Sequence, residues 1–385
     1  MGASRVVQRW TAIAVATTLP VFTGCGNFFP PINGGGGGGG GGTTLNRIYI
    51  ANQAANSIGG FAIGTGTLAA VNNSPVATTY KPLSMVVTPN NSLLYVGSAV
   101  GIFVYFINSD GSLATPSTGS QPAGVSAQSL AVSPDGQWLI ALDGTTQQLD
   151  IFQINATTGA LTSVNAPATY SILSGTWQPS DVQISRDGTL IFAALGTGGD
   201  VVFTFNTTSG VAVSSQYLPT GNLATGDYGI AVDPKTAYVY IARSGTNGGV
   251  AVFSIGSGGT LNPVNGSPFA AGSGTFSVTL DTTGTYVYAA NRTDATVSGY
   301  TIVPATATAT LSLTPLKDSP YTSGSVVQSL GIDATGKYLF AAAVGGGPDL
   351  TMYGFDITVP GKLDPVTSVA TGVDPAGAVA VALTH

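Results

Sequence analysis

One phrase recurs seven times along the chain, and it constrains the fold more than any other feature. In its clearest copy the apolar segment 130–132 is followed by the turn Pro134-Asp135-Gly136 and by a second apolar segment at 138–142. A loop, an alternating segment at 149–154 and a Gly-containing turn into a fourth segment complete the copy. Period-2 alternation with β-branched and aromatic residues indicates strands rather than a helix. Each copy therefore predicts four short antiparallel strands.

The copies align on the last apolar residue of the first predicted strand. These residues are Val87, Val132, Ile184, Val232, Leu280, Ile332 and Val381, at spacings of 45, 52, 48, 48, 52 and 49 residues. Pro, Asp, Asn or Gly follow in the turns, because they accept the dihedral angles of a hairpin. Four strands at this period are typical of a β-propeller blade. The sequence thus predicts an all-β, seven-bladed β-propeller over residues 45–385; a β-sandwich, the alternative, requires no such regular period.

The two ends of the repeat array complete one another. The array begins with segment 47–52, a second strand that no first strand precedes, and it ends with segment 378–383, a first strand that no second strand follows. We expect the C-terminal strand to be the innermost strand of the blade that residues 47–72 begin. Such pairing closes the ring and leaves no exposed sheet edge.

Residues 1–24 have the pattern of an export signal. Arg5 and Arg9 precede a short apolar run that ends at Phe22, followed by Thr-Gly-Cys. A basic start, a short apolar stretch and small residues at the end are typical of secretory signals, and the run is short for a membrane-spanning helix. Cys25 is the chain's one cysteine, and its setting resembles the lipobox of bacterial lipoproteins, which implies cleavage before Cys25 and its lipidation. The alternative is an ordinary secretory signal with an incidental cysteine.

Residues 25–44 are expected to tether the propeller to a membrane through the lipid on Cys25. Nine consecutive glycines, Gly34 to Gly42, lie in this segment, and polyglycine behaves as a flexible coil. Residue 26 is Gly rather than Asp, so a signal for retention in the inner membrane is not evident. We therefore expect a monomer in the cell envelope, periplasmic or at the cell surface, with the outer membrane favoured.

Composition excludes several classes of function. Charged residues make up 7% of the chain, the net charge is −6, and the basic residues are not clustered, which argues against nucleic-acid binding. The sequence has no Glu, and its one His is the terminal His385, which we expect to be a frayed end. General acid–base chemistry usually uses His or Glu, and metal sites with nitrogen or sulfur ligands need clusters of them. We expect neither a metal nor a cofactor.

Polar residues that precede first strands or follow second strands are expected to gather at one mouth of the central channel. They include Asp143, Asp181, Asp200, Asp227, Arg243, Asn291 and Arg292. Two arginines from neighbouring blades can hold a carboxylate or phosphate by bidentate hydrogen bonds. We predict ligand-binding roles for Arg243, Arg292, Asn291, Asp227 and Asp143. The simpler alternative is that each arginine pairs with a nearby Asp.

The repeat also resembles a known family. The phrases Ser133-Pro-Asp-Gly-Gln-Trp-Leu, Tyr288-Ala-Ala-Asn-Arg and Thr158-Gly-Ala-Leu resemble the seven-bladed lactonases, or 6-phosphogluconolactonase-like propellers, and the similar Tyr-Val-Thr-Asn repeat proteins of microbial surfaces. The resemblance spans residues 45–385 and implies an active site of one His, one Glu and one Arg.

When the family's motif residues are matched to positions of this sequence, the resemblance implies that Arg292 is the family's arginine. It also implies that the family's Leu-Gly…Asp loop is retained at 195–200. The positions for its His hold Ser180 and Gly229, and the position for its Glu holds Ser244 or Arg243.

Two functions remain open from the sequence. The first, which we favour, is a binding or scaffold module for a glycan, a small anionic ligand or a protein partner. The alternative is a lactone hydrolase, a carboxylic ester hydrolase with a degenerate active site. Its candidate catalytic residues are Arg292, Asp200 and Asp181, where an Asp would replace the missing base and Arg292 would polarise the carbonyl.

Overall fold

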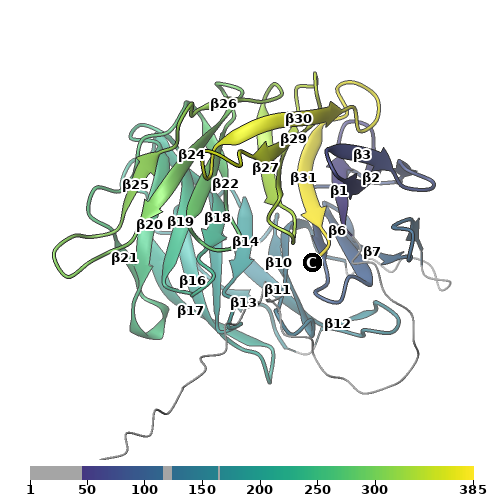
Figure 1. Ribbon diagram of the computed structural model, residues 1–385. Coiled ribbons are helices and arrows are strands. Elements are labelled where there is room, and N and C mark those ends of the chain that lie inside the picture. Colours follow the sequence, from purple (N-terminus) through teal and green to yellow (C-terminus); the bar gives the residue numbers. More distant parts are fainter. Residues whose placement is uncertain (1–45, 116–123, 164) are drawn as a thin grey trace, which may run out of the picture. The chain divides into compact units, whose positions relative to one another are not determined.

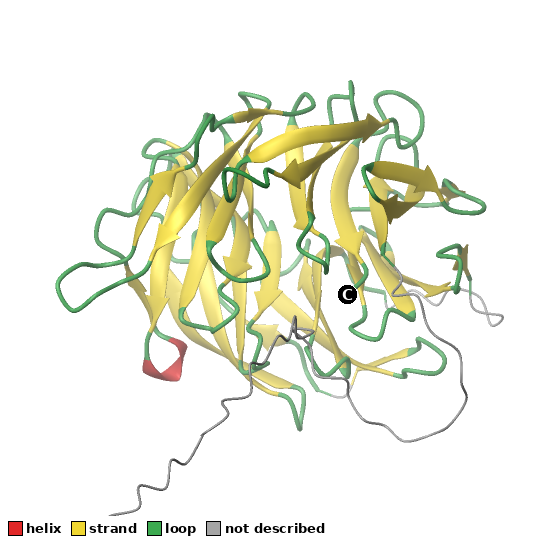
Figure 2. Ribbon diagram, in the orientation of Figure 1, coloured by secondary structure: helices red, strands yellow, loops and turns green. Residues whose placement is uncertain are grey.

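The computed structural model describes residues 46–115, 124–163 and 165–385, which form seven antiparallel sheets (Figure 2). The helical structure within these ranges is one 3₁₀ turn, η1 (Ser257–Gly259). No helix in the described part of the chain is long and apolar enough to cross a membrane. The signal at 1–24, the lipidation site Cys25 and the tether at 25–44 lie outside the described residues.

Each sheet is one blade, and its strands are named here from the innermost outward. Blade 1 consists of β31 (Ala378–Leu383), β1 (Arg47–Asn52), β2 (Ser57–Gly64) and β3 (Thr67–Ala70). Blade 2 consists of β5 (Ser84–Val87), β6 (Leu93–Ser98), β7 (Gly101–Ile107) and β8 (Leu113–Ala114). Blade 3 consists of β9 (Ala127–Val132), β10 (Trp138–Asp143), β11 (Gln148–Ile154) and β12 (Leu161–Ser163). Blade 4 consists of β14 (Asp181–Ile184), β15 (Leu190–Ala194), β16 (Asp200–Asn206) and β17 (Val211–Leu218).

Three further blades complete the ring. Blade 5 consists of β18 (Thr225–Val232), β19 (Tyr238–Gly245), β20 (Gly249–Ile255) and β21 (Leu261–Pro263). Blade 6 consists of β22 (Thr275–Leu280), β23 (Tyr286–Asn291), β24 (Thr296–Val303) and β25 (Ser312–Pro315). Blade 7 consists of β27 (Val327–Ile332), β28 (Tyr338–Ala343), β29 (Leu350–Phe355) and β30 (Leu363–Val369). The short strands β4 (Val76–Ala77), β13 (Ala168–Thr169) and β26 (Tyr321–Thr322) pair with the third strands of blades 1, 3 and 6.

The innermost strands contact one another in sequence around the ring, from β5 through β27 to β31 and back to β5. Blade 1 is closed by the end of the chain: β31 pairs antiparallel with β1, and Figure 1 shows the yellow β31 beside the purple β1. The predicted all-β, seven-bladed propeller with a first blade closed by the C-terminal strand is therefore confirmed.

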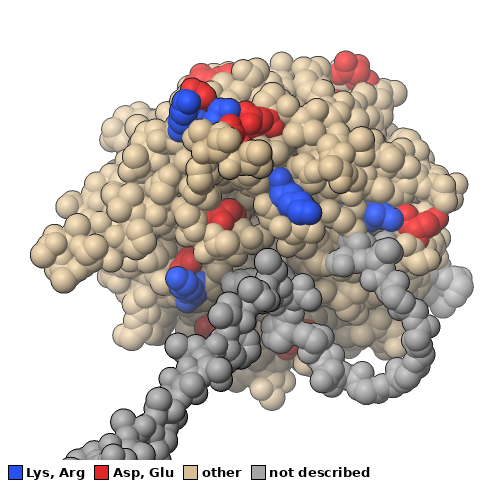
Figure 3. All heavy atoms as spheres, viewed as in Figure 1, with Lys and Arg blue, Asp and Glu red and all other residues tan. Residues whose placement is uncertain are grey.

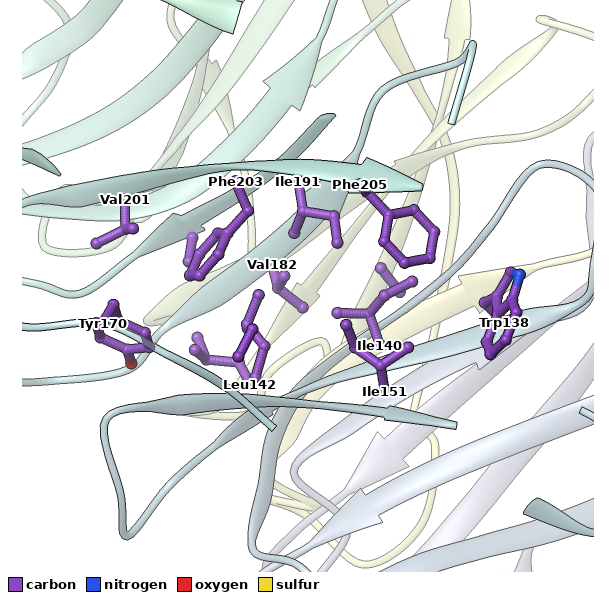
Figure 4. Close-up of a cluster of buried hydrophobic side chains, with 14 of the residues drawn as sticks. Trp138, Ile140, Leu142, Ile151, Tyr170, Val182, Ile191, Val201, Phe203 and Phe205 are labelled. Carbon is purple, nitrogen blue, oxygen red and sulfur yellow. The ribbon is translucent and has the colours of Figure 1, made fainter. Parts of the chain in front are cut away.

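The hydrophobic core is divided among the seven gaps between neighbouring blades. Figure 4 shows the gap between blades 3 and 4, where Trp138 and Ile140 face Phe203 and Phe205. Side chains alternate along each strand, so one row of a blade faces the preceding blade and the other row faces the next. Every blade is thus buried on both sides, which explains its near-continuous apolar second strand.

Tyrosines of the second strands link neighbouring blades by hydrogen bonds. The hydroxyls of Tyr49, Tyr95 and Tyr288 donate to backbone carbonyls of Gly111, Gly159 and Gly361, at 2.8, 2.9 and 2.6 Å. In each case the glycine lies in the turn between the third and fourth strands of the next blade. A buried tyrosine needs a partner for its hydroxyl, and this turn supplies one at the same place in these three copies. These three tyrosines are therefore packed between blades.

A second set of contacts joins the innermost strands. A side-chain oxygen on one inner strand accepts a hydrogen bond from a backbone N–H of the next. The acceptors are Ser129, Asp181, Ser277 and Ser329, and the donors are Val182, Ile230, Leu330 and Val381, at 3.1, 2.8, 3.2 and 3.3 Å. All four acceptors occupy the same register position of the repeat. We call them the inner ring.

The hairpin turns have the predicted structure, whereas the C-terminus does not. Asp135 accepts from the Ser133 hydroxyl and the Gln137 amide, and Gly136 has a φ of +71°. His385, which we expected to be a frayed end, is instead bonded to Asn91 in a turn of blade 2, with both backbone contacts at 2.7 Å. The amide side chain of Asn91 provides both a donor and an acceptor, which is why the last residue is held.

Burial of a charge in the closing strand should destabilise the whole ring. Ala382 is buried against Tyr49 and Leu94 in the gap between blades 1 and 2. Ala382→Asp places an unpartnered carboxylate there, at a cost of about 3 kcal/mol, and we expect the melting temperature to fall by about 5–10 °C. Ile357→Asp, at a side chain that is 98% exposed, is the control and should change it by no more than about 1 °C. Equal shifts in thermal unfolding would contradict the closure argument.

Asp181 should make stability depend on pH, because burial between the inner strands raises its pKa to about 6. In the unfolded chain the carboxyl ionises near pH 4, so the folded protein binds the extra proton between about pH 4 and 6 and loses stability as pH rises through that window. Asp181→Ser keeps an acceptor of the kind that the inner ring uses elsewhere and removes this loss. Asp181→Ala leaves the Ile230 amide unpartnered and should be less stable than the serine variant by about 1–2 kcal/mol. Thermal melts of the three proteins at pH 4 and 7.5 measure both effects; coinciding curves for the two variants would rule out the role of the acceptor.

Candidate functional site

Two adjoining depressions lie where blades 5 and 6 meet, at the end of the propeller where the second strands finish. The larger has a volume of about 730 Å³ and is lined by Arg243, and the smaller has a volume of about 360 Å³ and is lined by Arg292. They share Ser244, Gly274 and Thr293. We call the two together the rim pockets. The structure thus brings the two predicted arginines, from neighbouring blades, into one site.

The lining of the larger pocket is rich in small residues. Besides Arg243 it consists of Ala, Gly, Ser and Thr residues, drawn mainly from segments 244–248 and 271–275. None of the residues that line either pocket is Asp, Glu or His. Charged side chains form only a few separated groups on the face of the molecule in Figure 3. The chemistry available to a ligand in the rim pockets is therefore hydroxyl and amide hydrogen bonding plus two guanidinium groups.

Arg243 forms a bidentate ion pair with Asp227. Its Nε and Nη2 donate to Oδ1 and Oδ2 of Asp227, both at 2.7 Å. The Asp227 side chain is fully buried, whereas that of Arg243 is 15% exposed. Burial by itself lowers the pKa of Arg243, but the hydrogen bonds and charge of Asp227 outweigh it and raise that pKa. A guanidinium has five N–H donors, so Asp227 fixes its orientation and leaves the Nη1 donors without a bond to this carboxylate.

Asp200 lies behind this ion pair, in contact with Asp227. It is 3% exposed, and neither of its oxygens accepts a hydrogen bond from an N–H or O–H group of the described residues. Burial, followed by the charge of Asp227 and a hydrogen bond with it, raises the pKa of Asp200 well above its usual range, and the charge of Arg243 opposes this only in part. Burial therefore favours the neutral form of the Asp200 carboxyl group.

The glycine-rich loop before Asp200 fixes the geometry of this pair. Gly196 and Asp227 exchange two backbone hydrogen bonds, at 2.9 and 3.0 Å, which tie blade 4 to blade 5. Gly196 and Gly199 have φ values of +59° and +86°, which side chains disfavour. The Leu-Gly…Asp loop at 195–200 thus places Asp200 beside Asp227.

Arg292 rests on an aromatic stack. Its guanidinium lies 4.8 Å from the centroid of the Phe276 ring, and Phe276 stacks on Tyr228 with ring centroids 4.9 Å apart and planes 23° apart. Such a cation–π contact orients the guanidinium without using its N–H donors. Within the described ranges the Arg292 side chain makes no ion pair and no hydrogen bond. The alternative, that each arginine pairs with a nearby Asp, is therefore right for Arg243 and wrong for Arg292.

Gly229 explains why the stack forms. It occupies the position at which other blades carry the inner-ring acceptor, and a Cβ there would lie 2.8 Å from the backbone carbonyl oxygen of Phe276. The missing side chain lets β18 and β22 approach closely. Tyr228, one residue earlier, consequently meets Phe276 face to face.

The other predicted site residues are used within the protein. Asn291 is fully buried; its amide donates to the hydroxyls of Thr296 and Ser298 and its oxygen accepts from the Gly272 amide, so it supports the floor of the larger pocket. Asp143 lies in blade 3, where its Oδ1 accepts three hydrogen bonds from Thr145 and Thr146. Burial opposes these bonds but does not cancel them, and the pKa of Asp143 is lowered. Neither Asn291 nor Asp143 lines a rim pocket.

Both oxygens of Asp181 are used as well, in hydrogen bonds to Ile230, Ser129 and Gln183. Sequence reasoning missed the aromatic stack under Arg292, and it missed the buried Asp150, whose pKa burial and the charge of Asp143 raise to about 6. No group of three or more His, Cys, Asp or Glu that could hold a metal occurs in the described part of the chain.

Comparison with known proteins places this geometry in context. The family model for the seven-bladed β-propeller lactonases matches residues 228–372, a range that includes both rim-pocket arginines. The periplasmic gluconolactonase of Pseudomonas aeruginosa superimposes with a TM-score of 0.69 at 16% identity, over 88% of this chain and 99% of that one. A Bacteroides fragilis protein provisionally named a 6-phosphogluconolactonase gives a TM-score of 0.71 at 16% identity, over 90% and 100%. No curated protein matches the chain in sequence.

At these identities the solved structures establish the fold. The match to the family model is independent of them, and it covers the blades that carry the rim pockets. The chain is therefore a seven-bladed β-propeller, and its residues 228–372 match the model of the lactonase family that the repeat phrases resemble.

Proposed function

We propose that the rim pockets bind a small hydroxylated anion of the sugar-acid class. The observation that carries this proposal is Arg292, whose guanidinium is oriented by Phe276 yet has no protein acceptor among the described residues. An arginine oriented by an aromatic ring and left without an acceptor is suited to bidentate hydrogen bonding of a carboxylate or phosphate. The Ser, Thr and glycine amides around it match the hydroxyls of a sugar.

Hydrolysis of a sugar lactone is the second candidate, because the family match includes the blades that form the pockets. Arg292 could then polarise the lactone carbonyl. The reaction also needs a base to activate water, and neither pocket is lined by a carboxylate or an imidazole. Asp200 lies behind Arg243 and Asp181 is bonded within the inner ring. Binding without turnover is therefore the function that we favour.

Titration calorimetry with D-gluconate tests the proposal. Arg292→Ala should weaken binding by at least about tenfold, because a hydrogen-bonded ion pair contributes about 1.5–3 kcal/mol. Arg292→Lys should bind more tightly than Arg292→Ala but less tightly than the wild type, since lysine keeps the charge but cannot form the bidentate pair of hydrogen bonds. Lys235→Ala, in an exposed turn at the other end of blade 5, is the control. Unchanged affinity in Arg292→Ala would exclude this site. Opening of glucono-lactone by the wild type, above the spontaneous rate and abolished in the same variant, would establish the hydrolase instead.

The propeller is also proposed to act from a lipid anchor in the cell envelope, with Cys25 as the lipidated residue. Expression in a Gram-negative host with labelled palmitate should label the wild type and bring it to the membrane fraction. Cys25→Ser should lose both the label and the membrane association; since the chain has one cysteine, no other thiol can take the lipid. A secreted, unlabelled wild type would favour the ordinary signal peptide.

A further inference from the structure

Asp200 interrupts a column of the repeat that is otherwise apolar. The residue at the start of the third strand that faces the next blade is Ile58, Ile102, Leu149, Val250, Val297 and Leu350 in the other six blades. In blade 4 it is Asp200, opposite Ala194. A carboxyl group at a position built for a branched aliphatic side chain is costly unless it is neutral or paired.

The neighbours of Asp200 offer an acceptor rather than a donor. The charged groups that reach it are Asp227 on β18 and Arg243 on β19, and the N–H donors of Arg243 that meet this cluster go to Asp227. An ionised Asp200 would therefore face a second carboxylate with no hydrogen-bond donor to either of its oxygens. A protonated Asp200 can donate to Asp227, which satisfies both groups.

We propose that Asp200 is a positioning residue for anion binding: it holds one proton, donates it to Asp227, and so keeps the cluster of Asp200, Asp227 and Arg243 electrically neutral. The proposal rests on the proposed function, since it concerns the charge that an anion meets at the larger rim pocket. Asp200 touches no ligand itself, because it does not line either pocket. It acts through Arg243, which lines the larger pocket and is oriented by Asp227.

Loss of the proton would make the neutral cluster negative. With a neutral Asp200, an anion at Arg243 meets one guanidinium balanced by one carboxylate that lies behind it. With an ionised Asp200 the cluster of two carboxylates and one guanidinium carries a net charge of −1. This charge lies in a buried setting, where charges are screened less than at the surface. We expect the affinity for an anion to fall by roughly tenfold or more.

The proton itself can be observed by infrared difference spectroscopy at pH 8, where Asp150 and Asp181, with pKa values of about 6, are ionised. Wild-type protein should show the carbonyl stretch of a protonated carboxylic acid, and Asp200→Asn should lack it. Asp150→Asn removes another buried carboxyl, in blade 3, and should keep the band. Absence of an acid band that depends on Asp200 would overturn the proposal.

Binding is tested with sulfate, whose charge stays constant over the pH range used. In the wild type the dissociation constant for sulfate should rise about tenfold across the same pH interval in which the acid band disappears. Asp200→Asn, which is neutral at every pH, and Asp200→Val, which restores the residue type of blades 5 and 6, should bind sulfate without this dependence. A wild-type affinity that is unchanged as the band disappears would overturn the positioning role and leave the ligand site standing. Failure of the wild type to bind sulfate or gluconate while the band is present would overturn the proposed function together with it.

Discussion

Five residue pairs join β31 to β1, and through this ladder the last residues of the chain become the innermost strand of the blade that the first described residues begin. Without this ladder blade 1 would lack its innermost strand, whereas every other blade is built from one continuous segment. The ladder also determines which gaps are filled: β31 contributes Ala382 to the core between blades 1 and 2 and Ala378 to the core between blades 7 and 1. Everything positioned by the ring, including the rim pockets, depends on this closure.

The chain holds neighbouring blades together with few charges. Aliphatic and aromatic side chains fill the gaps, tyrosine hydroxyls bond a turn of the next blade, and short hydroxyls bond backbone amides between inner strands. A buried hydroxyl needs one partner and costs little to desolvate, whereas a buried carboxylate or ammonium needs several. A composition of 7% charged residues is consistent with this construction. It also means that a charge placed inside a gap stands out as an exception.

The repeat predicted the strands, the turns and the closure because each of these depends on local sequence and on a regular period. Asp135 and Gly136 form the turn that their dihedral preferences favour. Segment 378–383, which no second strand follows in the sequence, pairs with β1 as expected. The side-chain contacts across the gaps between blades could not be predicted from the repeat in the same way. Arg243 and Asp227 pair because β18 and β19 are adjacent, while Arg292 lies on Phe276 because a glycine in the preceding blade allows close approach. One signal was available in the sequence: alignment of the copies column by column isolates Asp200 among six aliphatic residues.

The departures from the repeat coincide with the candidate site. Gly229 replaces an inner-ring acceptor, and the strand contact that it permits supports the aromatic stack under Arg292. Asp200 replaces an aliphatic residue, and the pair that it forms with Asp227 lies directly behind Arg243. Gly229 gives up a hydrogen bond that four blades make, and Asp200 gives up an aliphatic contact that six blades make. Sequences that break a local rule tend to do so where function requires it. The surroundings of both arginines therefore depend on the two residues, Gly229 and Asp200, that depart from the repeat. This is a stronger reason to place the ligand between blades 5 and 6 than the presence of two cavities there, because cavities also arise wherever loops fail to fill space.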